Sequence, residues 1–268
     1  LNTFDAMEHS SIKLGVGEHG YQRVLGIAST HIDDIHVYGA LEAQSYAGPW
    51  TDIDEDVEKL NVLAKFYQGD ARQHWSVTAM HYSNQWNSAD QIPARAVTQE
   101  IINPFGSLDN SLGGESERTS LSTHFQNQQG NNGYTLDAYI IDYNMQLWSN
   151  FTYLLDNPDS GDQFEQFDDR TIVGGRGEYH WQAGSAQEFK QRVGAELRHD
   201  DIGKVGLYQT QNRARFNTIR QDSVDQTSLG AFYELEWHFA TPWRSVFGVR
   251  IDHFSFEVEA DNPLTAGK

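Results

Sequence analysis

Two clusters in this chain combine residue types that could bind a metal. The acidic run 156–162, with Glu165, Asp168 and Asp169, could supply oxygen ligands to Ca²⁺, but it lacks the spacing of an EF-hand. The group His199-Asp200-Asp201 is better explained as the end of a strand that enters a polar loop. The sequence therefore predicts no metal site, and it leaves Ca²⁺ binding by 156–169 open.

Enzyme motifs are missing from the sequence. There is no Gly-x-Ser-x-Gly, no His-Glu-x-x-His and no P-loop, and Gly15-x-Gly17-x-x-Gly20 falls in a predicted hairpin rather than between a strand and a helix. Without Cys, the chain has no thiol chemistry and no disulfide. A net charge of −19 is opposite to the basic footprint that nucleic acid requires. We therefore expect no enzymatic activity, no cofactor and no nucleic-acid partner.

In the stretch 188–200, odd-numbered residues are mostly apolar and even-numbered residues are mostly charged. Because successive side chains of a strand point to opposite faces, it predicts a strand with one oily face and one ionic face. The stretches 57–67, 134–148 and 224–239 repeat this separation, and Ile141 belongs to the apolar set of 134–148. We expect a barrel in a membrane, with the apolar sets toward lipid and water or a plug inside. In 188–200 the apolar residues are Phe189, Val193, Ala195 and Leu197, and the charged ones are Glu188, Lys190, Arg192, Glu196, Arg198 and Asp200.

Alternation predicts about eleven strands, many of them longer than the roughly 5–6 residues of ordinary soluble strands. Crossing a bilayer takes about 9–11 tilted residues. Short turns alternate with long connections at 48–56, 87–117, 149–168 and 200–223, as turns and external loops do in outer-membrane barrels. The predicted strands are 10–17, 21–30, 34–47, 57–67, 73–86, 118–127, 134–148, 169–181, 188–199, 224–239 and 243–256.

Trp and Tyr gather near the ends of these strands. Such rings form girdles at the headgroup level of a bilayer, although aromatic residues also suit pleated strands in general. Their recurrence on both sides of the short turns favours a girdle. The residues are Tyr67, Trp75, Trp86, Tyr134, Trp148, Trp181, Trp237 and Trp243.

Several stretches together resemble one protein family. They are 40–43, 48–50, 59–61, 75–80, 90–97, 149–156, 161–166, 205–208 and 244–252. Over most of its length the chain resembles the barrel domain of TonB-dependent receptors, the outer-membrane transporters for scarce nutrients such as iron chelates. The resemblance implies an all-β, antiparallel transmembrane β-barrel of about 22 strands. Residues 1–268 would be roughly the N-terminal half of that barrel, without the plug domain and its energy-coupling box.

The resemblance also implies a function and partners. The function would be active uptake of a siderophore-like or other large scarce nutrient across the bacterial outer membrane. The partners would be outer-membrane lipid, a small-molecule nutrient such as an iron chelate, and the TonB energy-coupling protein acting through a missing N-terminal region. The barrel is expected to be monomeric. Two alternatives stay open: a passive porin or small complete barrel, and a soluble β-sandwich or solenoid binding module.

Aromatic residues and Arg on the long connections are the candidate ligand contacts, because rings and guanidinium groups suit a ringed or anionic chelate. We expect connections 87–117, 149–168 and 200–223 to share one rim, with the acidic 149–168 closing against arginines of 200–223. The candidate contacts are Trp86, Arg95, Phe105, Phe151, Tyr153, Phe164, Tyr208, Arg213 and Arg215. The charges expected to face the lumen, paired with neighbouring strands or a plug, are Lys190, Arg192, Glu196, Arg198, Glu234 and Glu236.

Overall fold

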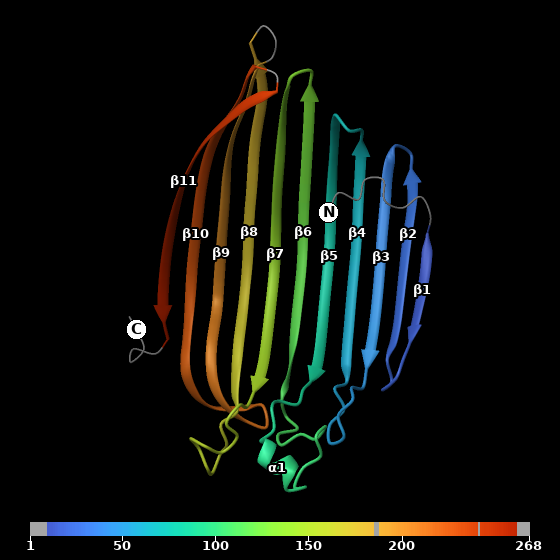
Figure 1. Ribbon diagram of the computed structural model, residues 1–268, viewed down its shortest axis with the longest axis vertical. Helices are drawn as coiled ribbons and strands as arrows, with labels where there is room; N and C mark the ends of the chain where they lie inside the picture. Colours follow the sequence, from blue (N-terminus) through green and yellow to red (C-terminus); the bar gives the residue numbers. More distant parts are fainter. Residues whose placement is uncertain (1–9, 185–187, 241, 262–268) are drawn as a thin grey trace.

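A computed structural model describes residues 10–184, 188–240 and 242–261, and over these residues the chain forms one sheet of eleven strands. The strands lie side by side in chain order, each antiparallel to the next, with β1 and β11 at the two open edges (Figure 1). This confirms the expected all-β, antiparallel architecture. The strands are β1 (Ser11–Val16), β2 (Gln22–Ile32), β3 (Ile35–Tyr46), β4 (Val57–Gly69), β5 (Gln73–Asn87), β6 (Gly113–Gln129), β7 (Asn132–Ser149), β8 (Phe164–Ala183), β9 (Phe189–Gln211), β10 (Ala214–Ala240) and β11 (Trp243–Ala260).

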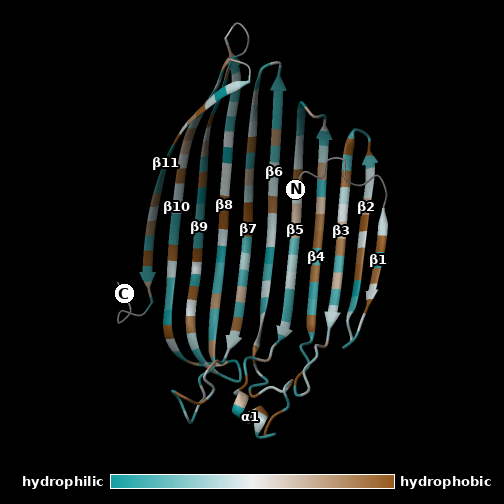
Figure 2. Cartoon of the chain, in the orientation of Figure 1, coloured by the Kyte–Doolittle hydropathy of each residue, from teal (hydrophilic) through white to brown (hydrophobic). Residues whose placement is uncertain are grey.

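Cross-strand partners form lateral rows, and all members of a row lie on the same face of the sheet. One row holds Thr30, Val37, Phe66, Val77, Thr123, Ala138, Gly175, Leu197, Leu229 and His253. The adjacent row holds His31, His36, Tyr67, Ser76, His124, Asp137, Arg176, Glu196, Gly230 and Asp252. Because the two rows are one residue apart, they lie on opposite faces. We call these the apolar face and the ionic face, and Figure 2 shows the resulting alternation of brown and teal along the strands.

Large hydrophobic side chains on the apolar face are exposed. Leu197 is 48% exposed, Leu229 49% and Ile251 72%, and the sheet of described residues is a single layer without a second one over this face (Figure 1). A soluble sandwich would bury these side chains between two layers. Their exposure in rows therefore favours lipid as the solvent of this face.

The same face becomes polar toward the end that carries the long connections. There its row reads Gln22, Ser45, Glu58, Gln85, Glu115 and Gln146. Strands of up to 27 residues, as in β10, are longer than a bilayer crossing needs. The strands therefore extend past the apolar band. Beyond it, alternate residues no longer divide into an apolar set and a charged set.

This extension corrects the expectation that Ile141 faces lipid. Ile141 is four residues from Asp137 in β7, so it lies on the ionic face, whereas Ile140, which is 46% exposed, lies on the apolar face. Apolar side chains occupy both faces of this part of β7, so the sequence pattern alone does not show which set faces lipid.

The three long connections, 47–56, 88–112 and 150–163, lie at one end of the sheet together with α1 (Ala94–Thr98) (Figure 1). The short turns 33–34, 70–72 and 130–131 lie at the other end. Among the described residues no helix is long and apolar enough to span a bilayer.

The expected long loop 200–223 is wrong. β9 continues to Gln211 and β10 begins at Ala214, so Asn212 and Arg213 alone form the turn. Both residues have positive φ, 50° and 66°, as the two central positions of a type I′ hairpin turn require. Polar residues in 200–223 resembled a loop, but ladder hydrogen bonds to the neighbouring strand satisfy their backbone.

The proposed aromatic girdle is only partly found. Trp75, Tyr134, Trp181, Trp237 and Trp243 lie on the apolar face. Tyr67 lies on the ionic face and is 7% exposed, and Trp148 is 9% exposed beneath the loops.

Candidate binding rim and ionic face

Connections 88–112 and 150–163 are fastened to each other at the rim. The carboxylate of Asp109 accepts hydrogen bonds from Asn150 Nδ2 at 2.9 Å and from Gln163 Nε2 at 3.0 Å. The Tyr153 hydroxyl donates to the carbonyl of Gln91 at 2.8 Å. The expected gathering of these loops on one rim is therefore confirmed by direct contacts.

Arg213, in the turn between β9 and β10, joins the hairpin to this cluster. Its Nε donates to the carbonyl of Ser111 at 2.8 Å, and its Nη2 donates to Asn87 Oδ1 and to the carbonyl of Leu112, each at 2.8 Å. The guanidinium carbon lies 4.8 Å from the ring centre of Trp148. These partners hold the guanidinium as a connector between loop and hairpin.

Arg215 forms a two-pronged ion pair with a buried carboxylate. Its Nε and Nη2 donate to the two carboxylate oxygens of Glu165, each at 2.6 Å, and Glu165 is 1% exposed. The guanidinium carbon lies 3.9 Å from the ring centre of Tyr208 and 5.1 Å from that of Phe167. The expected pairing of acidic 149–168 with arginines of 200–223 is found here, but between strands β8 and β10 rather than between loops.

Loop 150–163 is organised around Asp162. Its carboxylate accepts backbone N–H bonds from Leu155 at 2.7 Å, Asp156 at 3.1 Å and Asn157 at 2.8 Å. Desolvation opposes the ionised form, but these hydrogen bonds outweigh it and lower the pKa of Asp162 to about 2. The loop therefore keeps this anchor at every pH near neutrality.

The candidate ligand contacts fall into two groups. The polar groups of Tyr153, Tyr208, Arg213 and Arg215 form hydrogen bonds within the rim. By contrast, Phe105 is 53% exposed near Trp50, and Phe151 is 58% exposed against Phe164. Arg95 lies exposed on α1, and Trp86 lies at the rim end of β5. Sequence reasoning missed the exposed aliphatic residues Ile101, Leu108, Leu154 and Leu155.

These aliphatic residues share a sequence feature with the aromatic candidates. They are apolar residues inside connections that are otherwise polar, and they lie on loops that hydrogen bonds hold in place. A rule that selected only rings and arginines could not find them.

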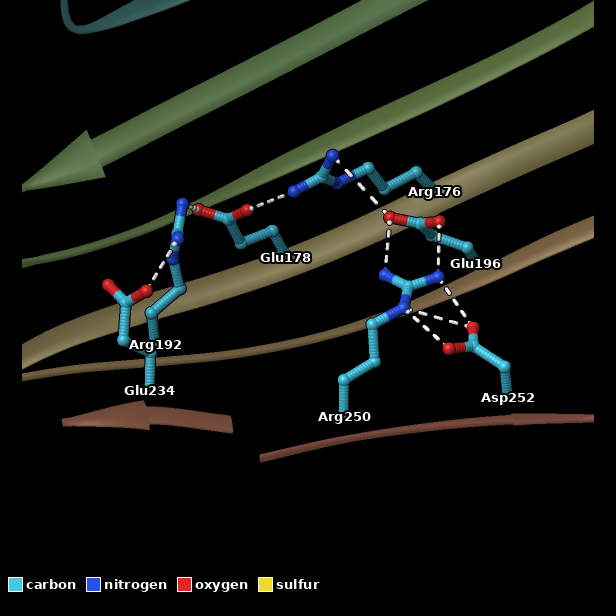
Figure 3. Close-up of polar contacts among 7 residues, drawn as sticks. All are labelled: Arg176, Glu178, Arg192, Glu196, Glu234, Arg250 and Asp252. Carbon is cyan, nitrogen blue, oxygen red and sulfur yellow. Dashed lines mark hydrogen bonds and ion pairs between the residues drawn. The ribbon is translucent and has the colours of Figure 1, made fainter. Parts of the chain in front are cut away.

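The ionic face of β8–β11 carries a continuous chain of ion pairs (Figure 3). Acidic and basic groups alternate along it, and each inner member contacts two partners. Its links are Glu234–Arg192 at 3.1 Å, Arg192–Glu178 at 3.6 Å, Glu178–Arg176 at 3.0 Å, Arg176–Glu196 at 3.5 Å, Glu196–Arg250 at 3.0 Å and Arg250–Asp252 at 2.7 Å. Every member of the chain therefore has at least one oppositely charged partner within the wall itself.

The remaining predicted charges are paired in the same way. Lys190 contacts Glu236 at 3.2 Å, and Arg198 contacts Asp200 at 2.6 Å. All six predicted charges thus share one face, and their orientation toward a lumen stays a prediction.

An aromatic ring lies flat within this chain. Phe232 lies between two guanidinium groups, 5.3 Å from Arg176 and 5.6 Å from Arg192. The ring covers Gly194 so closely that a Cβ there would come within 2.5 Å of its atoms. Glycine at this position therefore permits the ring to lie against the wall.

Comparison with known proteins identifies the family. Residues 49–267 match the family described as TonB dependent receptor-like, beta-barrel. The chain belongs to this family. No curated protein gives a significant sequence match.

Solved structures of outer-membrane transporters share the fold of this receptor barrel. The ferric-catecholate import receptor Fiu from E. coli K12, in its open form, has a TM-score of 0.66 and 12% identity, covering 95% of this chain and 46% of that one. The ferric citrate transporter FecA has a TM-score of 0.71 and 8% identity, covering 94% and 38%. The copper transporter OprC has a TM-score of 0.66 and 15% identity, covering 94% and 40%. The chain spans less than half the length of each.

Family membership places this receptor barrel in the bacterial outer membrane, within a group of transporters rather than enzymes. It also identifies the eleven strands as part of a larger barrel, in agreement with the open edges at β1 and β11. The outer-membrane location agrees with lipid on the apolar face.

The receptor barrel brings together four histidines that are scattered in the sequence. Rings of His31 and His36 lie 4.0 Å apart, and rings of His74 and His124 lie 5.1 Å apart in a stacked arrangement, all on the ionic face. Their sequence spacing gives no hint of this, because register across five strands creates the cluster. Within the described residues, no three His, Asp or Glu converge as a metal site, and Ca²⁺ binding by 156–169 stays open.

Proposed function

We propose that the complete receptor imports a scarce metal chelate across the outer membrane, driven by the TonB protein acting through a region outside this chain. The observation that carries this proposal is the rim. Exposed Phe105 and Phe151 project from loops that are cross-linked by buried and half-buried hydrogen bonds. A passive pore needs no such ordered apolar surface, whereas capture of a dilute ligand does.

The division of roles at the rim makes the proposal specific. Arg213, Asp109 and Gln163 hold the loops, and the exposed apolar residues of 88–112 and 150–163 contact the ligand. Hydrogen bonds within the protein already order these loops, so little conformational entropy remains to be lost when the ligand binds. Ligand affinity should therefore depend on Phe105 and Phe151 directly and on Arg213 through loop position.

The test replaces both rings in the complete receptor, Phe105→Ala with Phe151→Ala. We expect binding of a ferric catecholate, ferric citrate or Cu²⁺ bound as cargo to weaken at least about tenfold, which is ~1.4 kcal/mol. Surface assembly should stay normal, because neither ring is buried. Phe247→Ala is the matched control, since Phe247 is 57% exposed but lies on the apolar face.

Uptake is measured beside binding, with and without TonB. Unchanged affinity in the double variant would remove these loops from the binding site. Uptake that does not depend on TonB would instead support a passive pore, and binding of none of the three probes would contradict a metal-chelate cargo.

A further inference from the structure

Two glycines on the apolar face occupy positions where a side chain would fit. A Cβ added at Gly26 in β2 would meet no atom within 4 Å, and one at Gly39 in β3 would come no nearer than 3.8 Å to the carbonyl oxygen of Leu63. Neither glycine has a positive φ, so neither turn geometry nor crowding within the sheet requires it. Glycine inside a strand weakens the strand, and it often marks a place where a ligand or another backbone approaches closely.

These glycines lie in an apolar hollow of about 790 Å³ on β1 to β4. Its lining follows two rows of the apolar face, one through Ile12, Gly26 and Leu41 and one through Ala28 and Gly39. The residues between these rows point their side chains to the ionic face, so the hollow opens on the apolar face. Ile12 is 76% exposed and Leu41 is 53% exposed beside it.

A polar hollow of about 750 Å³ adjoins the apolar hollow on the side of the rim. Val24 and Ala43 line it, and each lies two residues from a member of the apolar hollow, Gly26 and Leu41. That separation is roughly 7 Å along a strand. The two hollows therefore follow one another along the strands. The polar residues of the apolar face that line the second hollow include Gln22, Ser45, Glu58, Gln85, Glu115 and Glu117.

The polar hollow carries negative charge that the protein does not neutralise. Among the described residues, neither Glu58 nor Glu115 has an ion-pair partner. Arg23 and Lys59 belong to the row between, and their side chains pair with Glu42 on the ionic face, at 2.5 Å and 3.8 Å. The carboxylates therefore favour a ligand that brings a positive charge.

We propose that the two hollows together bind one membrane lipid with a primary ammonium headgroup of the ethanolamine type. An acyl chain lies over Gly26 and Gly39, and the ammonium donates hydrogen bonds to the carboxylates of Glu58 and Glu115. Charge-assisted hydrogen bonds of this kind are about twice as strong as neutral ones. The order of the hollows is that of a lipid, because the apolar one lies in the apolar band and the polar one lies where that band ends.

A second copy of this chain is a poorer match for the same surface. A two-fold interface brings the same patch of both copies together, so residues at one height face each other. Glu58 and Glu115 would then meet the same carboxylates of the partner, and like charges oppose association. A lipid brings the opposite charge. Its binding does not depend on what the receptor imports.

The experiment measures lipid retention on the complete receptor by native mass spectrometry. The detergent micelles contain equal amounts of phosphatidylethanolamine, phosphatidylcholine and phosphatidylglycerol with the same acyl chains. We expect one phosphatidylethanolamine to stay bound at a roughly tenfold lower lipid concentration than the other two. Phosphatidylcholine tests the donor, because its ammonium carries a charge but no N–H. Equal retention of the three lipids would overturn the proposal.

The headgroup contacts are tested with Glu58→Gln/Glu115→Gln, which keeps the size of both side chains and removes their charge. The preference for phosphatidylethanolamine should disappear. Asp225→Asn/Glu257→Gln is the matched control, because these acidic residues face each other across β10 and β11 on the apolar face, outside both hollows. The control should keep the preference. A preference that survives in the first variant, or is lost in the control, would contradict the site.

The acyl-chain contacts are tested with Gly26→Leu/Gly39→Leu, which fills the apolar hollow. Retention of phosphatidylethanolamine should fall about tenfold. Ala138→Leu/Ala231→Leu, on the apolar face outside the hollow, should retain it. Unchanged retention in the glycine variant would exclude this hollow, and a receptor dimer that the glycine variant abolishes would favour a second copy instead. The glutamine variant decides the question where the leucine variant fails to assemble.

Discussion

Two rows of residues one position apart meet two different environments in this barrel. The row through Leu197 and Leu229 has a single ionisable member, His253, whereas the row through Asp137, Arg176 and Glu196 is ionisable at most positions. Lipid cannot solvate a charge, so the first row excludes charged residues. The second row needs water or partners, and the chain of ion pairs supplies the partners within the wall.

The largest expected effect separates neighbouring residues of β6. Leu121 is 49% exposed on the apolar face, and Ser122 follows it on the ionic face. Leu121→Arg should destabilise the assembled barrel by ~2–4 kcal/mol, because it places a cation in hydrocarbon. Ser122→Arg should cost much less. The measurement is the urea midpoint of the complete receptor refolded in lipid vesicles, and equal damage at both positions would contradict the assignment of faces.

A smaller effect is expected within the ion-pair chain. Glu196 and Arg250 have side chains that are 33% and 45% exposed, so water screens their attraction. A double-mutant cycle with Glu196→Gln and Arg250→Gln should give only a weak coupling, as for other solvent-screened ion pairs. Glu196→Gln with Lys59→Gln is the control pair, since these residues lie on distant strands and should be additive. A coupling as large as that of a buried ion pair would mean that this face is dry rather than hydrated.

The alternation of apolar and charged residues made the fold largely predictable from the sequence. In β9, Val193, Ala195 and Leu197 alternate with charges, so the strand and its two faces followed directly from the pattern. The number of strands and the long connections before β6 and β8 followed from the same rule, whereas the expected long connection 200–223 did not. This succeeds because a bilayer imposes one solvent on every second residue.

The rule fails where the bilayer ends. In 200–223 and in the rim half of β7, both faces meet water or other loops. The two faces therefore impose no alternation of apolar and polar residues. The hairpin at Asn212-Arg213 and the phase of Ile141 were therefore predicted incorrectly. The bonds of Arg213 to Ser111 and Leu112 join residues about a hundred positions apart, and no local pattern encodes them.

The smallest expected effect locates the edge of the lipid. Glu117 lies on the same strand and the same face as Leu121, four residues nearer the rim. That separation is roughly 13 Å along the strand, enough to leave the centre of the bilayer. Glu117→Arg should therefore change the free energy of unfolding, followed through the urea midpoint, by only ~0–1 kcal/mol, whereas Leu121→Arg costs several times more. His81, 3.8 Å from Glu117, would face a new positive charge, so His81→Gln is combined with Glu117→Arg to exclude that repulsion. A cost as large as that of Leu121→Arg would move the lipid boundary to the rim and place the row of Glu58 and Glu115 within it.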